Sequence, residues 1–297
     1  MVEQRAYVDQ RVSDLATATA AAQAAATTWG LSAPTLLRHG MNAIFRSGSH
    51  VVRVSTPSVP AERSLELAAV LAEAGIHVPA PSHSEVVRIG GFSVTSWQSI
   101  ESTGAPIDWS EVGSLVRRVH AMSVDQLPRG LPTPPATVFP WWDFDAMLDR
   151  TGGLLDERAR EGIVDALERH AGWRDFDHTV VCHGDVHPGN VVMSPDGPVL
   201  LDWDLLCLAP RGWDHGPLMT WTDRWGGEAG VYEAFADGYG WSARDDRGAE
   251  AFAELRLVAA TLMRVAAASL DDAARPEAEL RLRFWRGDRS APMWNAQ

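Results

Sequence analysis

Short alternations of apolar and polar residues dominate the first hundred positions of the chain. Gly40 and Gly48 interrupt the first alternations, and Gly90 interrupts the later ones. Alternation with a period of two between such turn residues is typical of antiparallel strands. The pattern predicts five strands, at 35–39, 43–46, 50–55, 86–89 and 92–97.

Two stretches of the same region have helical character. Apolar residues recur at helical spacing over 61–74 and stop at Gly75, a residue that favours the end of a helix. The Ala/Thr-rich stretch 8–28 predicts another helix, because alanine has the highest helix propensity. Strands and helices together predict a small β-rich lobe over residues 1–100.

The remaining residues, 101–297, predict a larger lobe that is mostly helical, with the joint near 98–103. Amphipathic or helix-rich patterns predict helices at 110–122, 142–150, 155–170 and within 213–285. Two short apolar runs, at 179–182 and 199–201, predict strands between these helices. The fold class expected from this order is α+β.

Charge and composition exclude several classes of protein. The 26 basic and 39 acidic residues give a net charge of −13. This argues against a nucleic-acid partner, because binding to a phosphate backbone depends on Lys and Arg. Every basic residue is Arg, since the chain contains no Lys. Schiff-base catalysis, covalently bound pyridoxal phosphate and a P-loop lysine are therefore excluded.

The compartment follows from two further features. The stretch 1–14 has no apolar core of a signal peptide, and no run of about 18 apolar residues occurs, which argues against a membrane role. The two cysteines, Cys182 and Cys207, are too far apart in sequence for a CxxC pair. A reducing cytoplasm is therefore the expected location.

The segment 181–190 carries the residues best suited to chemistry. The first apolar run delivers His183 and Asp185 into a loop, and a Pro-Gly step turns the chain so that Asn190 faces back. A hairpin then leads to the second apolar run, which delivers Asp202. We expect Asp185, Asn190 and Asp202 to surround one pocket mouth. One carboxylate can then accept a proton from a hydroxyl, while an amide oxygen and the other carboxylate hold Mg²⁺.

This set of side chains is that of a phosphotransferase, in which metal and positioning supply most of the catalysis. The spacing H-G-D-x-x-x-x-N over 183–190 is the kinase catalytic loop with Gly in second place. From about residue 29 to 284 the chain resembles the aminoglycoside phosphotransferase family, the small-molecule branch of the protein-kinase-like fold. The motifs that carry the resemblance lie at 40–42, 51–54, 78–81, 183–190, 201–203 and 213–214.

The resemblance implies a bilobal α+β protein-kinase-like fold. A small five-stranded antiparallel N-terminal lobe with one main helix would bind nucleotide, and the mostly helical C-terminal lobe would carry catalysis and the acceptor. It further implies transfer of the γ-phosphate of ATP or GTP to a small-molecule hydroxyl, with Mg²⁺ as cofactor. By matching positions, Asp185 would be the catalytic base, Asn190 and Asp202 the Mg²⁺ ligands, and His183 and Asp214 braces of the catalytic loop.

The nucleotide site departs from the kinase pattern at one position. Arg53 stands where kinases have a strand lysine that grips the α- and β-phosphates, and Arg can bind phosphate in bidentate fashion. Glu66 is its expected partner, with Glu62 as the alternative. The further nucleotide-binding positions are Asn42, Gln98 and Ser99.

The acceptor is predicted from charge. The net charge of −13 and the acidic, aromatic run 221–228 would attract a cation, and tryptophan faces would add cation–π contacts. The expected acceptor is a hydroxylated amine such as an aminoglycoside or amino sugar. A neutral acceptor remains the alternative, in which case the acidic residues only solubilise the protein.

Two other classes of function stay open. His183, Asp185 and His187 could form the metal site of a hydrolase. The Arg53 substitution could instead mark a pseudokinase that binds nucleotide without turnover. Asp204 could assist the metal or be an ordinary hydrogen-bonding residue.

Overall fold

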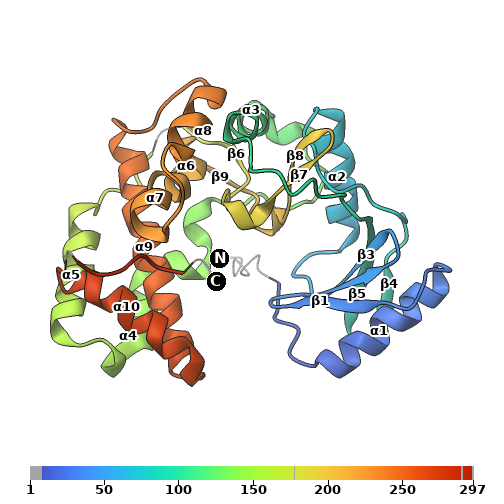
Figure 1. Cartoon of the computed structure of the whole chain (residues 1–297), viewed down its shortest axis with the longest axis horizontal. Coiled ribbons are helices and arrows are strands. Elements are labelled where there is room, and N and C mark those ends of the chain that lie inside the picture. The colour runs from blue at the N-terminus through green and yellow to red at the C-terminus, as the bar shows by residue number, and fades with distance from the viewer. Residues whose placement is uncertain (1–8, 177, 289, 296–297) are drawn as a thin grey trace. The chain divides into compact units, whose positions relative to one another are not determined.

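The structure is a computed structural model that describes residues 9–176, 178–288 and 290–295 (Figure 1). The chain divides into two compact units. Unit 1 comprises Met1–Asp108, Ala121–Pro134 and Pro188–Leu206; unit 2 comprises Trp109–His120, Pro135–His187 and Cys207–Gln297. The sequence predicts a division after residue 100. In the structure the first segment of unit 1 continues to Asp108, and two later segments, Ala121–Pro134 and Pro188–Leu206, also belong to this unit.

Unit 1 contains a five-stranded antiparallel sheet in the order β1-β2-β3-β5-β4. All five strands lie where the alternation predicts them, to within a residue at each end. Their bounds are β1 (Thr35–His39), β2 (Ala43–Ser47), β3 (His50–Ser55), β4 (Val87–Ile89) and β5 (Phe92–Gln98). The register pairs Arg53 of β3 with Thr95 of β5.

Two helices accompany this sheet. Helix α2 (Glu62–Glu73) agrees with the prediction. Helix α1 (Leu15–Thr28) begins seven residues later than predicted, at the N-cap Asp14. The chain before it is extended: Gln10 bridges to Thr56, so the backbone there is paired outside any helix. Buried alanines of α1 pack on the sheet in one core cluster, because their small side chains allow a close approach.

A second β-element of unit 1 is the hairpin of β7 (Val191–Ser194) and β8 (Gly197–Leu200). The strands predicted at 179–182 and 199–201 are both present, the second as β8. The first, β6 (Val180–Cys182), pairs with β9 (Cys207–Ala209) in unit 2, where the sequence predicts no strand. Across that ladder Cys182 lies opposite Cys207; both thiols are buried and free.

Helices make up most of unit 2. Their bounds are α3 (Trp109–His120), α4 (Phe144–Thr151), α5 (Glu157–Arg169), α6 (Gly212–Met219), α7 (Trp221–Trp225), α8 (Val231–Tyr239), α9 (Arg247–Ala268) and α10 (Arg275–Trp285). The helical unit and the five-stranded sheet together confirm the α+β fold class.

Helices α3 and α8 approach each other through glycines. A Cβ atom on Gly113 would lie 2.0 Å from the carbonyl oxygen of Phe235, and one on Gly238 would lie 1.8 Å from that of Ser110. Side chains at these positions would collide with backbone, so only glycine permits this packing. The close contact fixes His120, at the end of α3, beside Tyr239, at the end of α8.

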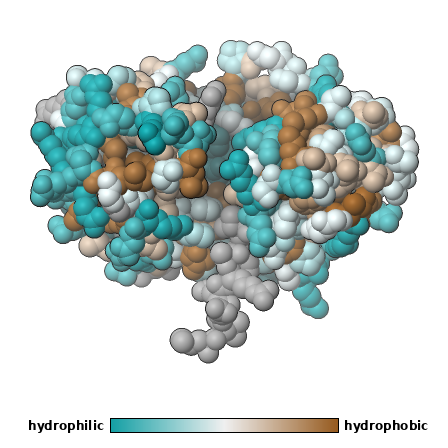
Figure 2. Space-filling view, turned by 90° about the horizontal axis from the view of Figure 1, so that it is seen from below, coloured by the Kyte–Doolittle hydropathy of each residue, from teal (hydrophilic) through white to brown (hydrophobic). Residues whose placement is uncertain are grey.

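The surface shown in Figure 2 is mixed, with small groups of hydrophobic residues among hydrophilic ones. Scattered exposed apolar side chains of this kind are normal for globular proteins. Within the described residues, no helix has the length and apolar character needed to cross a membrane.

Candidate active site

The predicted catalytic loop follows β6 directly in unit 2. His183 is completely buried, and Gly184 adopts a positive φ of 90° that turns the chain away from the strand. The backbone N–H of Asp185 lies 3.2 Å from Nδ1 of His183, which can accept from it. His183 therefore contacts the backbone of the loop that it begins.

Asp214, at the start of α6, holds this loop through its backbone. Its completely buried carboxylate accepts hydrogen bonds from the backbone N–H groups of His183 and Gly184, both at 2.8 Å. It also lies 3.0 Å from Nε2 of His120, whose Nδ1 lies 2.8 Å from the hydroxyl of Tyr239. Burial alone would raise the pKa of Asp214, but these contacts hold it below its ordinary value. The brace predicted for Asp214 is present.

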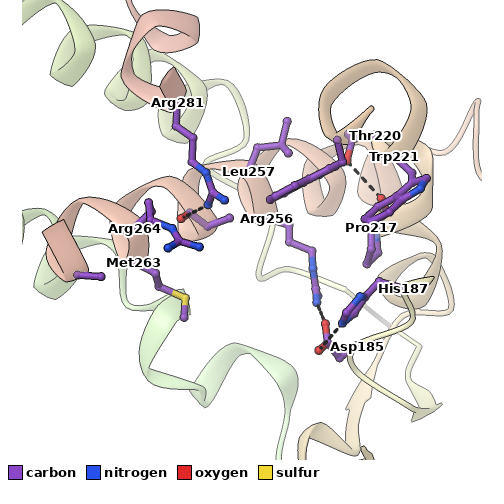
Figure 3. A pocket seen from close by; sticks show the side chains of 13 residues that line it. Asp185, His187, Pro217, Thr220, Trp221, Arg256, Leu257, Met263, Arg264 and Arg281 are labelled. Atoms are coloured by element: carbon purple, nitrogen blue, oxygen red, sulfur yellow. Dashed lines mark hydrogen bonds and ion pairs between the residues drawn. The ribbon is translucent and has the colours of Figure 1, made fainter. Parts of the chain in front are cut away.

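Asp185 projects from the loop with about a quarter of its side chain exposed. One oxygen forms an ion pair with Nη2 of Arg256 on α9, and the other lies 3.4 Å from Nε2 of His187 (Figure 3). Arg256 also donates to the carbonyl of Gly184 at 3.3 Å. Burial would raise the pKa of Asp185, yet Arg256, His187 and His183 together lower it well below its usual range. Asp185 is thus a charged acceptor at neutral pH.

Asn190 and Asp202 lie in unit 1, at the open end of the β7–β8 hairpin. The last ladder pair joins Val191 to Leu200, and the N–H of Leu201 donates to the carbonyl of Asn190 at 2.9 Å. The hairpin therefore brings the residues that precede and follow it to the same end. Both belong to unit 1, whereas Asp185 belongs to unit 2.

The chemistry of this pair fits a magnesium ion. Asp202 has φ 61°, the sole positive value for a non-glycine residue in the described parts of the chain. Such a conformation is costly and is concentrated at functional sites. A carboxylate and a buried amide are the hard oxygen ligands that Mg²⁺ prefers.

Arg53 lies on β3 of unit 1 and is held by carboxylates. It forms an ion pair with Asp204 and a second, at 3.4 Å, with Asp9. Burial would lower the pKa of Arg53, but Asp204, Asp202 and Asp9 raise it, so the guanidinium stays charged. Asp204 lies in a short 3₁₀ turn, Trp203–Leu205, rather than on the continued strand that would have placed it beside Asp202.

Neither glutamate considered as the partner of Arg53 contacts it. Glu66 pairs with Arg63 at 2.5 Å, and Glu62 pairs with Arg88 at 2.7 Å. The expected Arg53–Glu66 pair is therefore absent from the ion pairs of the described residues. Asp204, one of the two partners of Arg53, comes instead from a segment 151 positions further along the chain.

The other predicted nucleotide residues lie at or just beyond the ends of strands of the same sheet. Asn42 donates to Asp204 at 3.4 Å, and its side-chain oxygen is buried without a hydrogen-bond partner. Gln98 ends β5, with its N–H donating to Ala80 at 2.8 Å. The N–H of Ser99 donates to Ser49 at 2.8 Å, and its hydroxyl accepts from Arg46 at 3.0 Å.

Of the trio considered for a hydrolase, Asp185 has its carboxylate 3.4 Å from Nε2 of His187 and its backbone N–H 3.2 Å from Nδ1 of His183. In the described part of the chain, the group close enough to share a metal ion is His120, Cys182 and Asp214. Burial raises the pKa of the Cys182 thiol, and the Asp214 carboxylate already accepts the hydrogen bonds of the loop. Within this group, Asp214 therefore holds the loop.

Beside Asp185, unit 2 contains a cavity of about 460 Å³ (Figure 3). The two tryptophans of α7, Trp221 and Trp225, line it as the sequence suggests for an acceptor pocket. The acids of the same run, Asp223 and Glu228, are exposed and do not line it. The prediction missed Arg256, Arg264 and Arg281, because nothing in a regular helical pattern marks an arginine that faces a cavity.

Comparisons with known proteins agree with this geometry. A model of the phosphotransferase enzyme family matches residues 29–255, and the chain belongs to that family. The aminoglycoside 3'-phosphotransferase of Streptomyces ribosidificus is 29% identical over an alignment of 154 residues that covers 42% of this chain and 51% of that protein. The match thus spans about half the length of this curated relative.

Solved structures show the fold. A choline/ethanolamine kinase family protein from Mesorhizobium loti aligns with a TM-score of 0.64 and 19% identity, over 93% of this chain and 94% of its own. Spectinomycin phosphotransferase in complex with ADP and spectinomycin aligns with a TM-score of 0.60 and 17% identity, over 88% and 90% of the two chains. These likenesses confirm the protein-kinase-like fold.

Proposed function

We propose that this protein transfers the γ-phosphoryl group of ATP to a hydroxyl of a small molecule. The observation that carries the proposal is the loop from His183 to Asp185, held by the buried carboxylate of Asp214 so that Asp185 projects as a charged proton acceptor. Membership of the phosphotransferase enzyme family supports the reaction class. The ADP bound to the spectinomycin phosphotransferase supports an adenine nucleotide.

In the proposed reaction the acceptor oxygen forms a bond to the γ-phosphorus while the bond from that phosphorus to the bridging oxygen of ADP breaks. Asp185 accepts the proton of the acceptor hydroxyl. Arg53 binds the α- and β-phosphates. Asn190 and Asp202 would hold Mg²⁺, which neutralises negative charge on the phosphates when bound.

The acceptor class has two lines of support that differ. The 29% identical relative is named for aminoglycosides, and the net charge of −13 favours a hydroxylated amine. The side chains that line the cavity beside Asp185 include three arginines and one acid, and they favour a negative charge on the acceptor.

Binding of Mg-ATP tests the proposal without knowledge of the acceptor. At about 100 times its Kd, Mg-ATP should stabilise the fold by roughly 2.7 kcal/mol, which raises the melting temperature by about 2–4 °C for a chain of this size. Asp202→Ala should abolish the magnesium-dependent part of this shift. Asp196→Asn, an exposed carboxylate in the turn of the same hairpin, is the matched control. A melting temperature indifferent to ATP, GTP and Mg²⁺ together would contradict the proposal.

A further inference from the structure

The cavity beside Asp185 lies wholly within unit 2, so its walls belong to one unit. Helix α9 forms one wall with residues spaced three, four or seven apart, which places them on one face of the helix. Pro217 and Thr220 of the α6 region and Trp221 of α7 form the opposite side (Figure 3), and Trp225 of α7 also lines the cavity. The α9 residues that line the cavity are Arg256, Leu257, Ala260, Met263, Arg264 and Ala267.

The ionised side chains of the cavity fall into two neutral pairs and one remaining cation. Arg256 is paired with Asp185. Arg281 is paired with Glu277 at 2.8 Å, and its guanidinium also stands over the ring of Trp225 at 5.0 Å. These two arginines therefore bring no uncompensated charge to the cavity.

Arg264 is the remaining cation. It is partly exposed, and within the described ranges no carboxylate forms an ion pair with it. It follows Arg256 by two turns of α9, which at 1.5 Å per residue is about 12 Å along the helix. The backbone position of this cation is therefore displaced along α9 from that of Arg256, the partner of Asp185.

Apolar side chains make up much of the remaining lining. Leu257, Ala260 and Met263 line the α9 side, and Trp221 lines the other. Trp221 and Trp225 are stacked with ring centroids 6.3 Å apart. A volume near 460 Å³ with apolar walls and a few polar groups is that of a small-molecule site.

These walls do not suit a polyamine. A cationic acceptor needs carboxylates at the positions of its amines, because a buried charge without a partner is costly. Asp185 is the one acid among the lining residues of the described chain, and it is already paired with Arg256 and close to His187. The acids that produce the net charge of −13 lie elsewhere.

We propose that the acceptor is a hydroxylated molecule with an apolar body and a carboxylate, with the carboxylate bound by Arg264 and the hydroxyl at Asp185. This inference rests on the proposed phosphotransferase function, of which it names the acceptor class. It replaces the amine that the net charge of −13 predicts with a carboxylate, because the charges that line the cavity, and not the net charge of the protein, determine which acceptor binds.

The test is direct binding, measured by calorimetry without nucleotide. The probes are 10-hydroxydecanoate, its carboxamide and 10-aminodecan-1-ol, which share an apolar body and a terminal hydroxyl but carry a negative, neutral or positive group. The wild-type protein should bind the carboxylate about tenfold more tightly than the amine, as expected for a charge-assisted hydrogen bond.

Charge reversal at Arg264 supplies the decisive variant. Arg264→Glu should invert this preference, and Arg264→Gln should abolish it. Arg247→Glu, at an exposed position at the start of the same helix, changes the net charge equally and should leave the preference unchanged. Equal or tighter binding of the amine by the wild type, or no binding of any probe, overturns the inference. Stabilisation by Mg-ATP is read separately, so failure of the inference is distinguishable from failure of the proposed function.

Discussion

In unit 1 the guanidinium of Arg53 lies between the carboxylates of Asp204 and Asp9, whereas in unit 2 the carboxylate of Asp185 lies against the guanidinium of Arg256. Both residues are charged, and each is compensated by a partner in its own unit. The compensation differs in sign. Around Arg53 the acids are in excess, whereas in the cavity beside Asp185 the excess charge is positive because of Arg264.

This difference indicates what each region can bind. An excess of carboxylates near Arg53, to which Asp202 contributes, favours a nucleotide that arrives with its magnesium ion rather than as a bare polyanion. The excess of positive charge near Asp185 favours an anionic acceptor. A net charge of −13 averages over both regions and therefore predicts neither.

The largest effect is expected from Asp185→Asn, which keeps the shape of the side chain but removes the proton acceptor. Turnover should fall by roughly 10²–10⁴, the usual range for general acid–base assistance, while stabilisation by Mg-ATP persists. The low end of that range is compatible with a loose phosphoryl transition state. ADP release in the presence of an acceptor measures the loss.

The matched control is Asp223→Asn, which removes an exposed carboxylate from the same unit. Turnover of this control should equal that of the wild type. Activity of Asp185→Asn within twofold of the wild type would show that another group accepts the proton.

Arg53→Ala should have the next largest effect. A hydrogen bond to a charged group is worth about 1.5–3 kcal/mol, so the KM for ATP should rise by roughly 10–100-fold, with a lower kcat. Arg53→Lys should retain part of the activity, since lysine binds phosphate as a point charge. Steady-state kinetics at varied ATP provides the measurement. Unchanged ATP kinetics in Arg53→Ala would assign the phosphates to another arginine.

The sequence was sufficient to predict the elements that depend on local pattern. The five strands of unit 1 alternate clearly and are separated by glycines such as Gly48, which has φ 61°. The H-G-D-x-x-x-x-N spacing located the loop of Asp185. Both signals lie within a few neighbouring residues, where propensity and turn chemistry act.

Partners far apart in sequence were not predictable in the same way. Strand β6 has three residues, and nothing in so short a run distinguishes β9 from β8 as its partner. Arg53 and Asp204 are 151 positions apart, and Asp185 and Arg256 are 71 apart. The pair of Arg63 and Glu66 is the opposite case, since its spacing of three on a helix could have revealed it.

The pH dependence of stability tests the excess of acids around Arg53, because Asp9 is one of these acids. Burial and the neighbouring Asp204 raise the pKa of Asp9 from 3.8 to about 6. Between these values the folded protein binds more protons than the unfolded chain, so stability falls as pH rises and the loss is complete above about pH 6. Asp9→Asn should remove this loss and stabilise the protein at pH 7 by on the order of 1 kcal/mol.

Urea denaturation of Asp9→Asn and of the wild type at several pH values provides the measurement. The difference in unfolding free energy should grow between pH 4 and pH 6 and remain constant above. Asp196→Asn, whose carboxylate is exposed, should show no such growth. A difference that is the same at pH 4 and pH 7 would contradict the raised pKa.

The smallest effect is expected from Asp204→Asn, which removes the main competitor for the guanidinium of Arg53. The ion pair is partly exposed, with 19% and 28% of the two side chains accessible. Pairs of this kind are worth about 0–1 kcal/mol, so the KM for Mg-ATP should fall by at most about fivefold. The fall should be smaller at high salt, because screening already weakens the pair in the wild type. Asp196→Asn should leave the KM unchanged. A rise in the KM would instead show that Asp204 helps to hold the metal or orients Arg53 for the phosphates, and the acids around Arg53 would then be part of the nucleotide site rather than its competitors.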